Sequence, residues 1–413
     1  MSGDKTWKKP SVTITETPSF PAAVAGVATG ISVFIGHTAS AANGLLKPTQ
    51  IGSLVEYERI FGGAMPGFNL FESVALFYRN GGGACFVVSV GDFTAGVDAA
   101  KLSAGLAAAG KQAGITMIAI PDAVLLKPDA GPAGPGQIPT SAQYQSLVRA
   151  MLEQCGTLQD RIALFDLYGT EAIAGAAPPA DQAGIDACVA NFQNAVGENF
   201  LSYGAAYFPF LELATGVAGH FRLVPPSGAI AGIFAANDAT RGVWNAPANV
   251  VVTGIHDVSL ALTEAQQVPL NAPINGKAVN AIRDFVNRGP VVWGARTLDG
   301  NSNDYRYIQV RRTIVYIEQS IKAALQPFIF AANDGQTWVT VTGMISNFLQ
   351  NLWQQGGLMG ATASAAFAVR CGLGSTMTDQ DILNGYMVVQ VMVSMIHPAE
   401  FIELTFKQQM QGA

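Results

Sequence analysis

The sequence predicts a layered α/β body followed by a smaller α+β domain. Three observations lead to this fold class. Apolar, strand-like runs alternate with amphipathic helical segments from about residue 31 to residue 296. Two long helical patterns and a short strand-forming stretch then follow, and the 413 residues suffice for two or three domains with separate cores. We expect an N-terminal arm at 1–22, a small α/β domain at 23–95, a middle α/β domain at 96–298 and an α+β domain at 299–413.

The first α/β domain is predicted from two strands and two helices. Residues 31–36 (ISVFIG) and 85–90 (CFVVSV) are apolar and rich in β-branched residues, which is typical of buried strands. A helix is expected from Ser53 to Phe61, ended by Gly62 and Gly63. A second helix at 70–78 would end before the glycines at 81–83.

The middle domain continues the alternation at larger spacing. Ser141 is the expected N-cap of a helix ending at Gly156. Apolar spacing predicts two further helices, at 185–196 and 279–285. The intervening strands and helices favour a mostly parallel sheet, with exposed Gly- and Pro-rich loops at 127–139 and 175–184. The predicted strands are 115–120, 162–165, 205–208 and 291–293.

The last domain begins with apolar residues three or four apart, from Val310 to Leu325, and a second helix follows the capping pair Asn333 and Asp334. Two strands are then expected, at 386–395 and 401–406, and two strands alone form a marginal sheet with open edges. The arm offers a further short strand between two lysines and two prolines. These patterns leave open whether the two chain ends pair within one molecule or between molecules. The arm residues are Val12, Thr13, Ile14 and Thr15, with Pro18 and Pro21 as a hinge; the C-terminal strand residues are Val389, Val391, Val393, Phe401, Ile402, Glu403, Leu404, Thr405 and Phe406.

The composition restricts the classes of partner. Only 13% of residues are charged while 49% are hydrophobic, so we expect much of the surface to be covered by other proteins. A net charge of −6 disfavours nucleic acid as a ligand. The four cysteines form no CxxC pair and are expected to be core residues. The apolar segment 22–36 is too short to span a bilayer, so no direct membrane insertion is expected.

No catalytic, cofactor or metal site is expected. Asp122 and Asp166 follow apolar strands, where an aspartate usually caps a turn. Ser227 with His220 or His256 could suggest a hydrolase, but no G-x-S-x-G motif is present. The four histidines lack metal-ligand spacing, and no phosphate-binding loop occurs.

A pair of arginines in the last domain has two interpretations. Arg311 and Arg312 lie close in sequence to Tyr305 and Tyr307, which could suggest contact with a phosphate or a nucleic acid. A solvated or partner-facing helix edge is the interpretation we favour.

Several blocks of sequence, in order along nearly the whole chain, resemble the tail sheath family of contractile phage tails and related injection particles. The arm PSVTITE at 10–16 is similar to the opening strand of that family. The ordered set, rather than any single block, makes the resemblance specific. The further blocks are 56–63 (EYERIFGG), 77–90 (FYRNGGGACFVVSV), 224–228 (VPPSG), Gly232, Asp238, 241–244 (RGVW), 246–249 (APAN), 293–297 (WGART), 310–312 (VRR), 333–334 (ND), 337–338 (TW), 348–349 (FL) and 352–353 (LW).

The resemblance implies a fold and a function. The middle domain would face outward and have a subtilisin-like fold without its catalytic residues. The C-terminal domain would hold a small sheet that strands from neighbouring subunits complete, which favours pairing between molecules. The chain would be a non-enzymatic structural subunit that forms stacked six-fold rings around an inner tube protein. From a metastable extended state the sheath would contract and drive the tube through a target envelope.

The same resemblance implies partners and a location. Expected partners are further copies of the chain, the inner tube protein, baseplate proteins and tail terminator or cap proteins. Assembly would take place in the bacterial cytoplasm, and the product would be a virion tail or a released particle. Two alternatives remain at this point: an α/β hydrolase-like enzyme, which labelling of Ser227 by a fluorophosphonate would favour, and a non-contractile tube or baseplate component.

Overall fold

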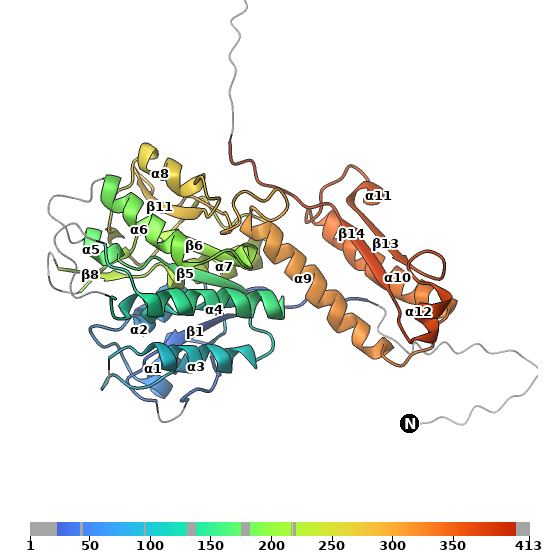
Figure 1. Cartoon of the computed structure of the whole chain (residues 1–413), viewed down its shortest axis with the longest axis horizontal. Coiled ribbons are helices and arrows are strands. Elements are labelled where there is room, and N and C mark those ends of the chain that lie inside the picture. The colour runs from blue at the N-terminus through green and yellow to red at the C-terminus, as the bar shows by residue number, and fades with distance from the viewer. Residues whose placement is uncertain are drawn as a thin grey trace, which may run out of the picture. The chain divides into compact units, whose positions relative to one another are not determined.

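The computed structural model describes residues 23–41, 44–94, 96–129, 138–174, 182–215, 217 and 220–401. They divide into two compact units (Figure 1). The large unit comprises the described residues of Val27–Gln319 and the segment that begins at Met395, and the small unit comprises Ser320–Ser394 together with the described residues 23–26. The expected arm strand, its hinge prolines and residues 402–406 lie outside the described residues.

The large unit is built on one extended sheet, which has nine strands among the described residues. Its central strands β3, β1, β4, β5, β6 and β11 are parallel, whereas β2, β12 and β9 join antiparallel at the two ends. The prediction of a mostly parallel sheet is therefore confirmed. Because β1 pairs with both β3 and β4, one sheet spans residue 95, where the boundary between the first two α/β domains was expected. In spatial order the strands are β2 (Thr49–Ile51), β3 (Cys85–Ser89), β1 (Ser32–Gly36), β4 (Met117–Ala119), β5 (Ile162–Asp166), β6 (Gly204–Phe208), β11 (Val279–Phe285), β12 (Gly289–Val292) and β9 (Val250–Val251).

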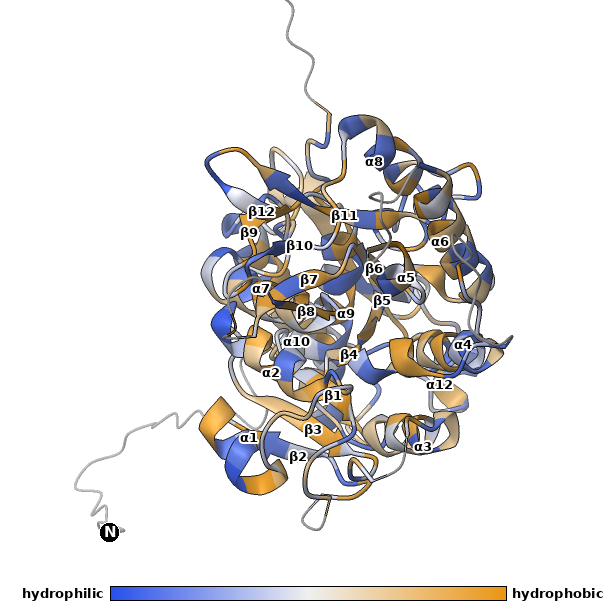
Figure 2. Ribbon diagram, turned by 90° about the vertical axis from the view of Figure 1, so that its left-hand side faces the viewer, coloured by the Kyte–Doolittle hydropathy of each residue, from blue (hydrophilic) through white to orange (hydrophobic). Residues whose placement is uncertain are grey.

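Helices cover both faces of this sheet, and strand alternation divides the core accordingly. Val33 and Ile35 of β1 belong to one apolar cluster, while Phe34 between them belongs to the other. Figure 2 shows both apolar and polar residues on helices such as α4, as an amphipathic covering helix requires. The first face carries α3 (Ala99–Gly110), α4 (Ala142–Leu158), α6 (Gln182–Ala195) and α8 (Glu264–Asn271), and the second carries α1 (Leu54–Phe61), α2 (Leu70–Arg79) and α7 (Ser227–Arg241).

The helices α2 and α7 approach each other closely because α7 has glycines at two facing positions. A Cβ atom on Gly228 would lie 2.2 Å from the carbonyl oxygen of Ser73, and one on Gly232 would lie 2.3 Å from that of Phe77. Only glycine fits there without displacing the α2 backbone. This contact fixes the start of α7 against α2.

The remaining elements of the large unit are α5 (Thr170–Ala174), the short helices η1 (Pro121–Leu125) and η2 (Leu201–Tyr203), and a second sheet of β10 (Asp257–Val258), β7 (Leu211–Ala214) and β8 (Phe221–Val224).

The predicted helix starts at Ser53 and Ser141 are confirmed in the large unit, whereas one helix and one helix end were predicted wrongly. The Ser53 side chain accepts a hydrogen bond from the backbone of α1, and Ser141 does so for α4. The helix expected at 279–285 is instead strand β11, because its first four residues are buried in the sheet and its apolar residues only coincidentally recur every three positions. Likewise α4 continues past Gly156 to Leu158 and ends where Gln159 adopts a left-handed conformation.

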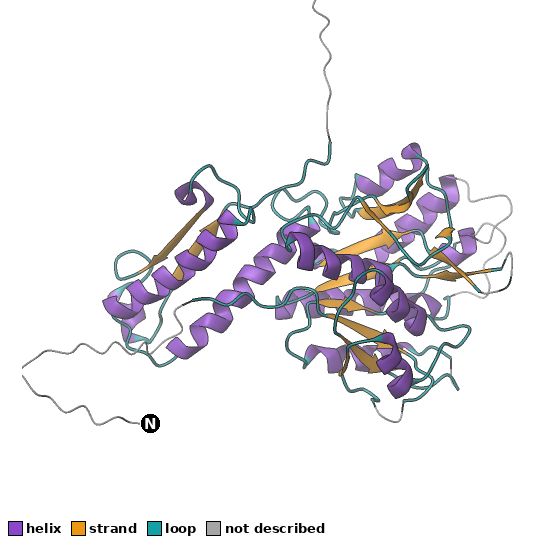
Figure 3. Ribbon diagram, turned by 180° about the vertical axis from the view of Figure 1, so that it is seen from behind, coloured by secondary structure: helices purple, strands orange, loops and turns teal. Residues whose placement is uncertain are grey.

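The small unit contains the long helix α10 lying along a two-stranded antiparallel sheet (Figure 3). The predicted strand at 386–395 is confirmed over Val389–Val393. Its partner strand β13 was not predicted. The elements are η3 (Gln326–Phe328), α10 (Gly335–Gln354), α11 (Ala363–Ala366), β13 (Phe367–Cys371), α12 (Asp379–Leu383) and β14 (Val389–Val393); the helix α9 (Ile308–Leu325) has residues in both units.

In the parts of the chain that the structure describes, every helix falls short of the length and apolar character needed to cross a membrane.

Candidate subunit-interaction sites

Ser227 and Asp166 lie together at the N-terminus of α7. The Asp166 carboxylate accepts hydrogen bonds from the backbone N–H of Ser227 at 2.8 Å and from its hydroxyl at 2.6 Å. Both residues are buried. Burial raises the pKa of Asp166 to about 7, although the two hydrogen bonds from Ser227 oppose that rise. The carboxylate thus caps a buried helix start rather than facing a substrate.

The residues considered for a hydrolase do not assemble into one. Ser227 donates its hydroxyl hydrogen directly to Asp166, where a histidine base would have to stand in a triad. The ring of His256 instead stacks on Phe221 with 4.1 Å between centroids, and His220 lies immediately before β8. Among the described residues, no group of three or more His, Cys, Asp or Glu side chains could hold a metal ion.

Asp122 also has a structural role. Its carboxylate is fully buried and accepts hydrogen bonds from the backbone N–H groups of His37 at 2.8 Å and Asn69 at 2.7 Å. It therefore joins the end of β1 to the start of α2. The expectation that each aspartate caps the turn after its strand was wrong, because both accept hydrogen bonds from segments that lie far away in sequence.

The interpretation of Arg311 and Arg312 as a solvated or partner-facing edge was wrong. Both side chains are buried. The Arg311 guanidinium lies over the rings of Tyr203 and Tyr305, at 4.3 and 3.5 Å from their centroids. Arg312 forms an ion pair with Asp238. Both arginines hold the start of α9 within the large unit.

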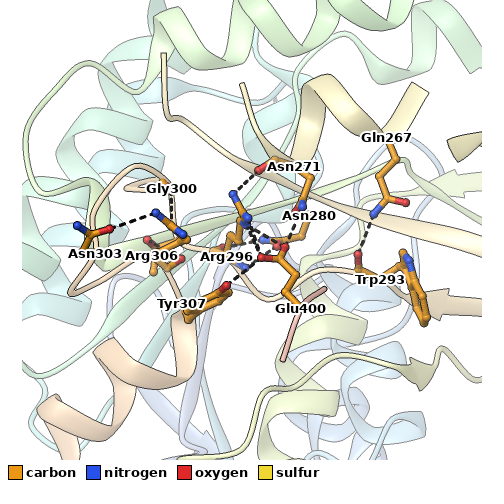
Figure 4. Close-up of polar contacts among 11 residues, drawn as sticks. Gln267, Asn271, Asn280, Trp293, Arg296, Gly300, Asn303, Arg306, Tyr307 and Glu400 are labelled. Carbon is orange, nitrogen blue, oxygen red and sulfur yellow. Dashed lines mark hydrogen bonds and ion pairs between the residues drawn. The ribbon is translucent and has the colours of Figure 1, made fainter. Parts of the chain in front are cut away.

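The segment after Met395 is bound to the large unit by a carboxylate contact (Figure 4). The Arg296 guanidinium donates from Nε at 2.9 Å and from Nη2 at 2.6 Å to the two oxygens of Glu400. Asn271 donates its side-chain amide to the same carboxylate at 2.8 Å, and the Tyr307 hydroxyl donates at 2.9 Å. We call Arg296, Asn271 and Tyr307 the clasp.

The clasp lowers the pKa of Glu400. Burial alone would raise this pKa, but the hydrogen bonds from Arg296, Asn271 and Tyr307, together with the charge of Arg296, outweigh burial. Glu400 is therefore an ionised, hydrogen-bonded carboxylate at neutral pH.

A groove of about 780 Å³ borders the clasp. Its lining combines the chain at Pro398–Phe401 with Trp293, which is partly exposed, and with polar side chains that include Arg283 and Glu264. Phe401 is 77% exposed and lies outside any strand. The strand expected from 401 to 406 thus has its first residue in an irregular segment, and residues 402–406 are outside the described range.

The small sheet has open edges. Among the described residues, β13 and β14 pair only with each other, from Phe367 opposite Val393 to Cys371 opposite Val389. Val389, Val391 and Val393 alternate along β14 and are all partly buried, whereas Gln390 and Met392 between them are exposed. Each strand therefore retains one edge with which a further strand could pair.

Sequence reasoning missed the clasp. Arg296 lies within the WGART block, whereas Glu400 lies between the two strands expected at 386–395 and 401–406 and was given no role. The two residues are 104 positions apart, so no local spacing links them. The contact could have been suggested only by asking which basic residue neutralises an acidic side chain in an apolar setting.

The buried carboxylates serve internal contacts, whereas the open edges of the small sheet suit a protein that assembles by strand addition. Comparison with known sequences places it more narrowly. Residues 133–298 match the phage tail sheath protein central domain, and residues 301–409 match the phage tail sheath C-terminal domain. The chain belongs to the contractile tail sheath family.

Solved structures of contractile particles are similar to the chain along its whole length. The anti-feeding prophage (AFP) helical sheath in its contracted state is 33% identical, with 98% of this chain and 100% of that chain covered and a TM-score of 0.74. The sheath of an extracellular contractile injection system, the PVC sheath complex in its contracted state, is 28% identical over 98% and 99% of the chains, with a TM-score of 0.74. A chain of the six-fold symmetrised AFP baseplate is 32% identical over 98% and 100%, with a TM-score of 0.72.

A curated relative matches a shorter stretch. The tail sheath protein of Vibrio phage KVP40 is 26% identical over 140 residues, which make up 33% of this chain. The matched stretch spans about a fifth of the length of that relative. A sheath tail protein from Listeria innocua, at 10% identity over 91% of this chain and 96% of that one with a TM-score of 0.59, shares the fold alone.

Proposed function

We propose that this sheath subunit polymerises as stacked six-fold rings around an inner tube and contracts from a metastable extended state to drive the tube through a target envelope. One observation carries the proposal: likeness over 98% of the chain to two sheaths in their contracted state. The similar chain in a six-fold symmetrised baseplate supports the ring symmetry. Further expected partners are baseplate proteins and terminator or cap proteins. Assembly would occur in the bacterial cytoplasm before incorporation into a virion tail or a released particle.

Subunits would be joined by strands added to the open-edged sheet of β13 and β14. The donated strands are Val12–Thr15 of the arm and Phe401–Phe406 of the C-terminal segment, with Pro18 and Pro21 as the hinge of the arm. Main-chain hydrogen bonds suit a moving lattice because they join subunits without fixing the angle between their bodies. An arm strand making about three such bonds contributes roughly 3 kcal/mol at each junction. Repetition along a helical array would turn these weak junctions into a continuous mesh.

Contraction would be driven by interface free energy without nucleotide hydrolysis. The same bodies need two packings, of which the contracted one buries more surface. The middle part of the chain would serve as an outward-facing, subtilisin-like body without catalytic activity. The hydrogen bond that the Ser227 hydroxyl donates to Asp166 supports that view, because this hydroxyl already has an acceptor and Ser227 is buried.

Removing residues 1–17 tests this function. We expect soluble, folded subunits that form no sheaths, since the donated strand is lost. Ile14→Pro should act in the same direction because it removes a main-chain donor, while Ile14→Val keeps that donor and should assemble normally. Negative-stain electron microscopy measures the outcome. Long sheaths formed by the truncated chain would disprove the proposal.

A further inference from the structure

Arg296 of the clasp is also held by contacts that do not involve Glu400. The backbone N–H of Arg296 donates to the side-chain oxygen of Asn280 at 2.7 Å, and the side-chain amide of Asn280 donates back to the Arg296 carbonyl at 2.8 Å. The Arg296 Nη1 atom donates to the Asn271 carbonyl at 2.9 Å. Asn280 lies buried on β11 and holds the backbone of Arg296, while the Asn271 carbonyl holds its guanidinium, and neither contact involves Glu400.

The donors of the clasp come from three separate parts of the large unit. Asn271 is the last residue of α8, Arg296 follows β12, and Tyr307 directly precedes α9. Arg296 is 7% exposed at its side chain and Glu400 is 19% exposed, so the ion pair is largely shielded from solvent. A carboxylate in this setting makes more and better-shielded contacts than a surface ion pair, which usually contributes little.

The position of Glu400 in the sequence suggests what the clasp does. Strand β14 ends at Val393, and the chain re-enters the large unit at Met395. Glu400 directly precedes residues 401–406, the strand that we propose crosses to a neighbouring subunit. Glu400 therefore lies in sequence between the open-edged sheet and the donated C-terminal strand.

We propose that the clasp anchors the root of the C-terminal strand to the large unit, with Glu400 of the same chain as its occupant, so that tension in the strand mesh passes into the body of the subunit. This inference rests on the proposed strand exchange. An anchor must resist pulling along the chain. This requirement accounts for the four donor groups on one carboxylate, because donors from three parts of the large unit resist the pull from several directions.

The first test measures release of the anchor in the purified full-length chain. Chymotrypsin can cleave after Phe401 only when the residues before it enter the protease, so cleavage follows the fraction of molecules in which the clasp is open. Cleavage after Phe406 in the same molecule serves as the internal reference. We expect Glu400→Gln to raise the ratio of Phe401 to Phe406 cleavage about tenfold, measured by mass spectrometry. A tenfold change corresponds to about 1.4 kcal/mol.

Matched variants isolate the carboxylate contact. Glu264→Gln removes a negative charge from the same groove without touching the clasp and should leave the ratio unchanged. Arg296→Lys keeps the positive charge but loses the bidentate geometry, so its ratio should fall between wild type and Glu400→Gln. Tyr307→Phe removes one donor and should raise the ratio the least. An unchanged ratio in both Glu400→Gln and Arg296→Lys would overturn the clasp as an anchor.

The second test asks whether the anchor carries load. Sheaths of Glu400→Gln should be shorter than those of wild type and Glu264→Gln, and fewer should convert fully from the extended to the contracted form, as counted by electron microscopy. If Phe401 cleavage rises but sheath length and conversion equal those of wild type, the mechanical role is refuted while strand exchange stands. Failure of the C-terminal strand exchange itself would be visible separately, as sheaths formed by a chain that ends at Glu400.

Discussion

Asp166 and Glu400 are acidic side chains of the same unit in contrasting settings. Asp166 has two donors, both from Ser227, and burial outweighs them, so its pKa rises to about 7. Glu400 has five hydrogen bonds from three residues, one of them with a guanidinium, and its pKa falls below the ordinary value. Asp166 is the more deeply buried of the two and lacks a cationic donor, whereas Glu400 is partly buried and its donors include a guanidinium. Burial and the supply of charge-compensating donors together decide whether a carboxylate stays ionised.

The largest expected effect comes from removing the inner carboxylate. Asp166→Ala leaves the backbone N–H and hydroxyl of Ser227 buried without their acceptor, and should lower the free energy of unfolding by about 3 kcal/mol. Urea denaturation followed by circular dichroism measures it. The exposed Asp304→Ala is the control and should change stability by less than about 0.5 kcal/mol. Equal stability of the two variants would mean that Asp166 does not hold the start of α7.

Much of the large unit could be predicted from sequence because its signals are local. Ser53 and Ser141 mark helix starts by side-chain chemistry that acts within one turn, and β1, β3, β4, β5 and β6 are short apolar runs. The error at β11 has a physical cause: a strand buried on both faces loses the alternation that distinguishes it from a helix segment. Sequence alone could not resolve that ambiguity.

The small sheet and the clasp were harder to predict for different reasons. Strand β13 is short, follows an alanine-rich stretch and is only partly buried, so its pattern is weak. The clasp and Glu400 come from α8, the chain after β12, the residue before α9 and the C-terminal segment, and only the folded structure brings these parts together. Family resemblance identified the WGART block but gave no reason for its arginine; the structure supplies one.

The pH dependence of stability separates the two carboxylates by sign. Asp166 has a raised pKa in the folded state, so unfolded chains lose its proton first, and the site destabilises the fold as pH rises from about 4 to about 7. Asp166→Asn can keep both contacts with Ser227 and cannot ionise. Relative to wild type it should gain up to about 1.4 kcal/mol for each pH unit across that range. Urea midpoints at pH 5 and pH 8 test this, with Asp304→Asn as control; a constant difference between Asp166→Asn and wild type would contradict it.

The contact between Glu400 and the clasp should depend on pH in the opposite sense to Asp166, and the effect should be smaller. Because the folded-state pKa of Glu400 is lowered, its contribution is fully present above the ordinary glutamate pKa of about 4.3 and is lost as pH falls through the lower folded value. Pepsin works in this range, and the ratio of its cleavage after Phe401 to that after Phe406 should rise a few-fold below about pH 4 in wild type. Circular dichroism at each pH confirms that the body is still folded. Glu400→Gln has no proton to gain at this position, so its ratio should be high at every pH and nearly flat; a rise in Glu400→Gln as steep as in wild type would show that some other group opens the clasp.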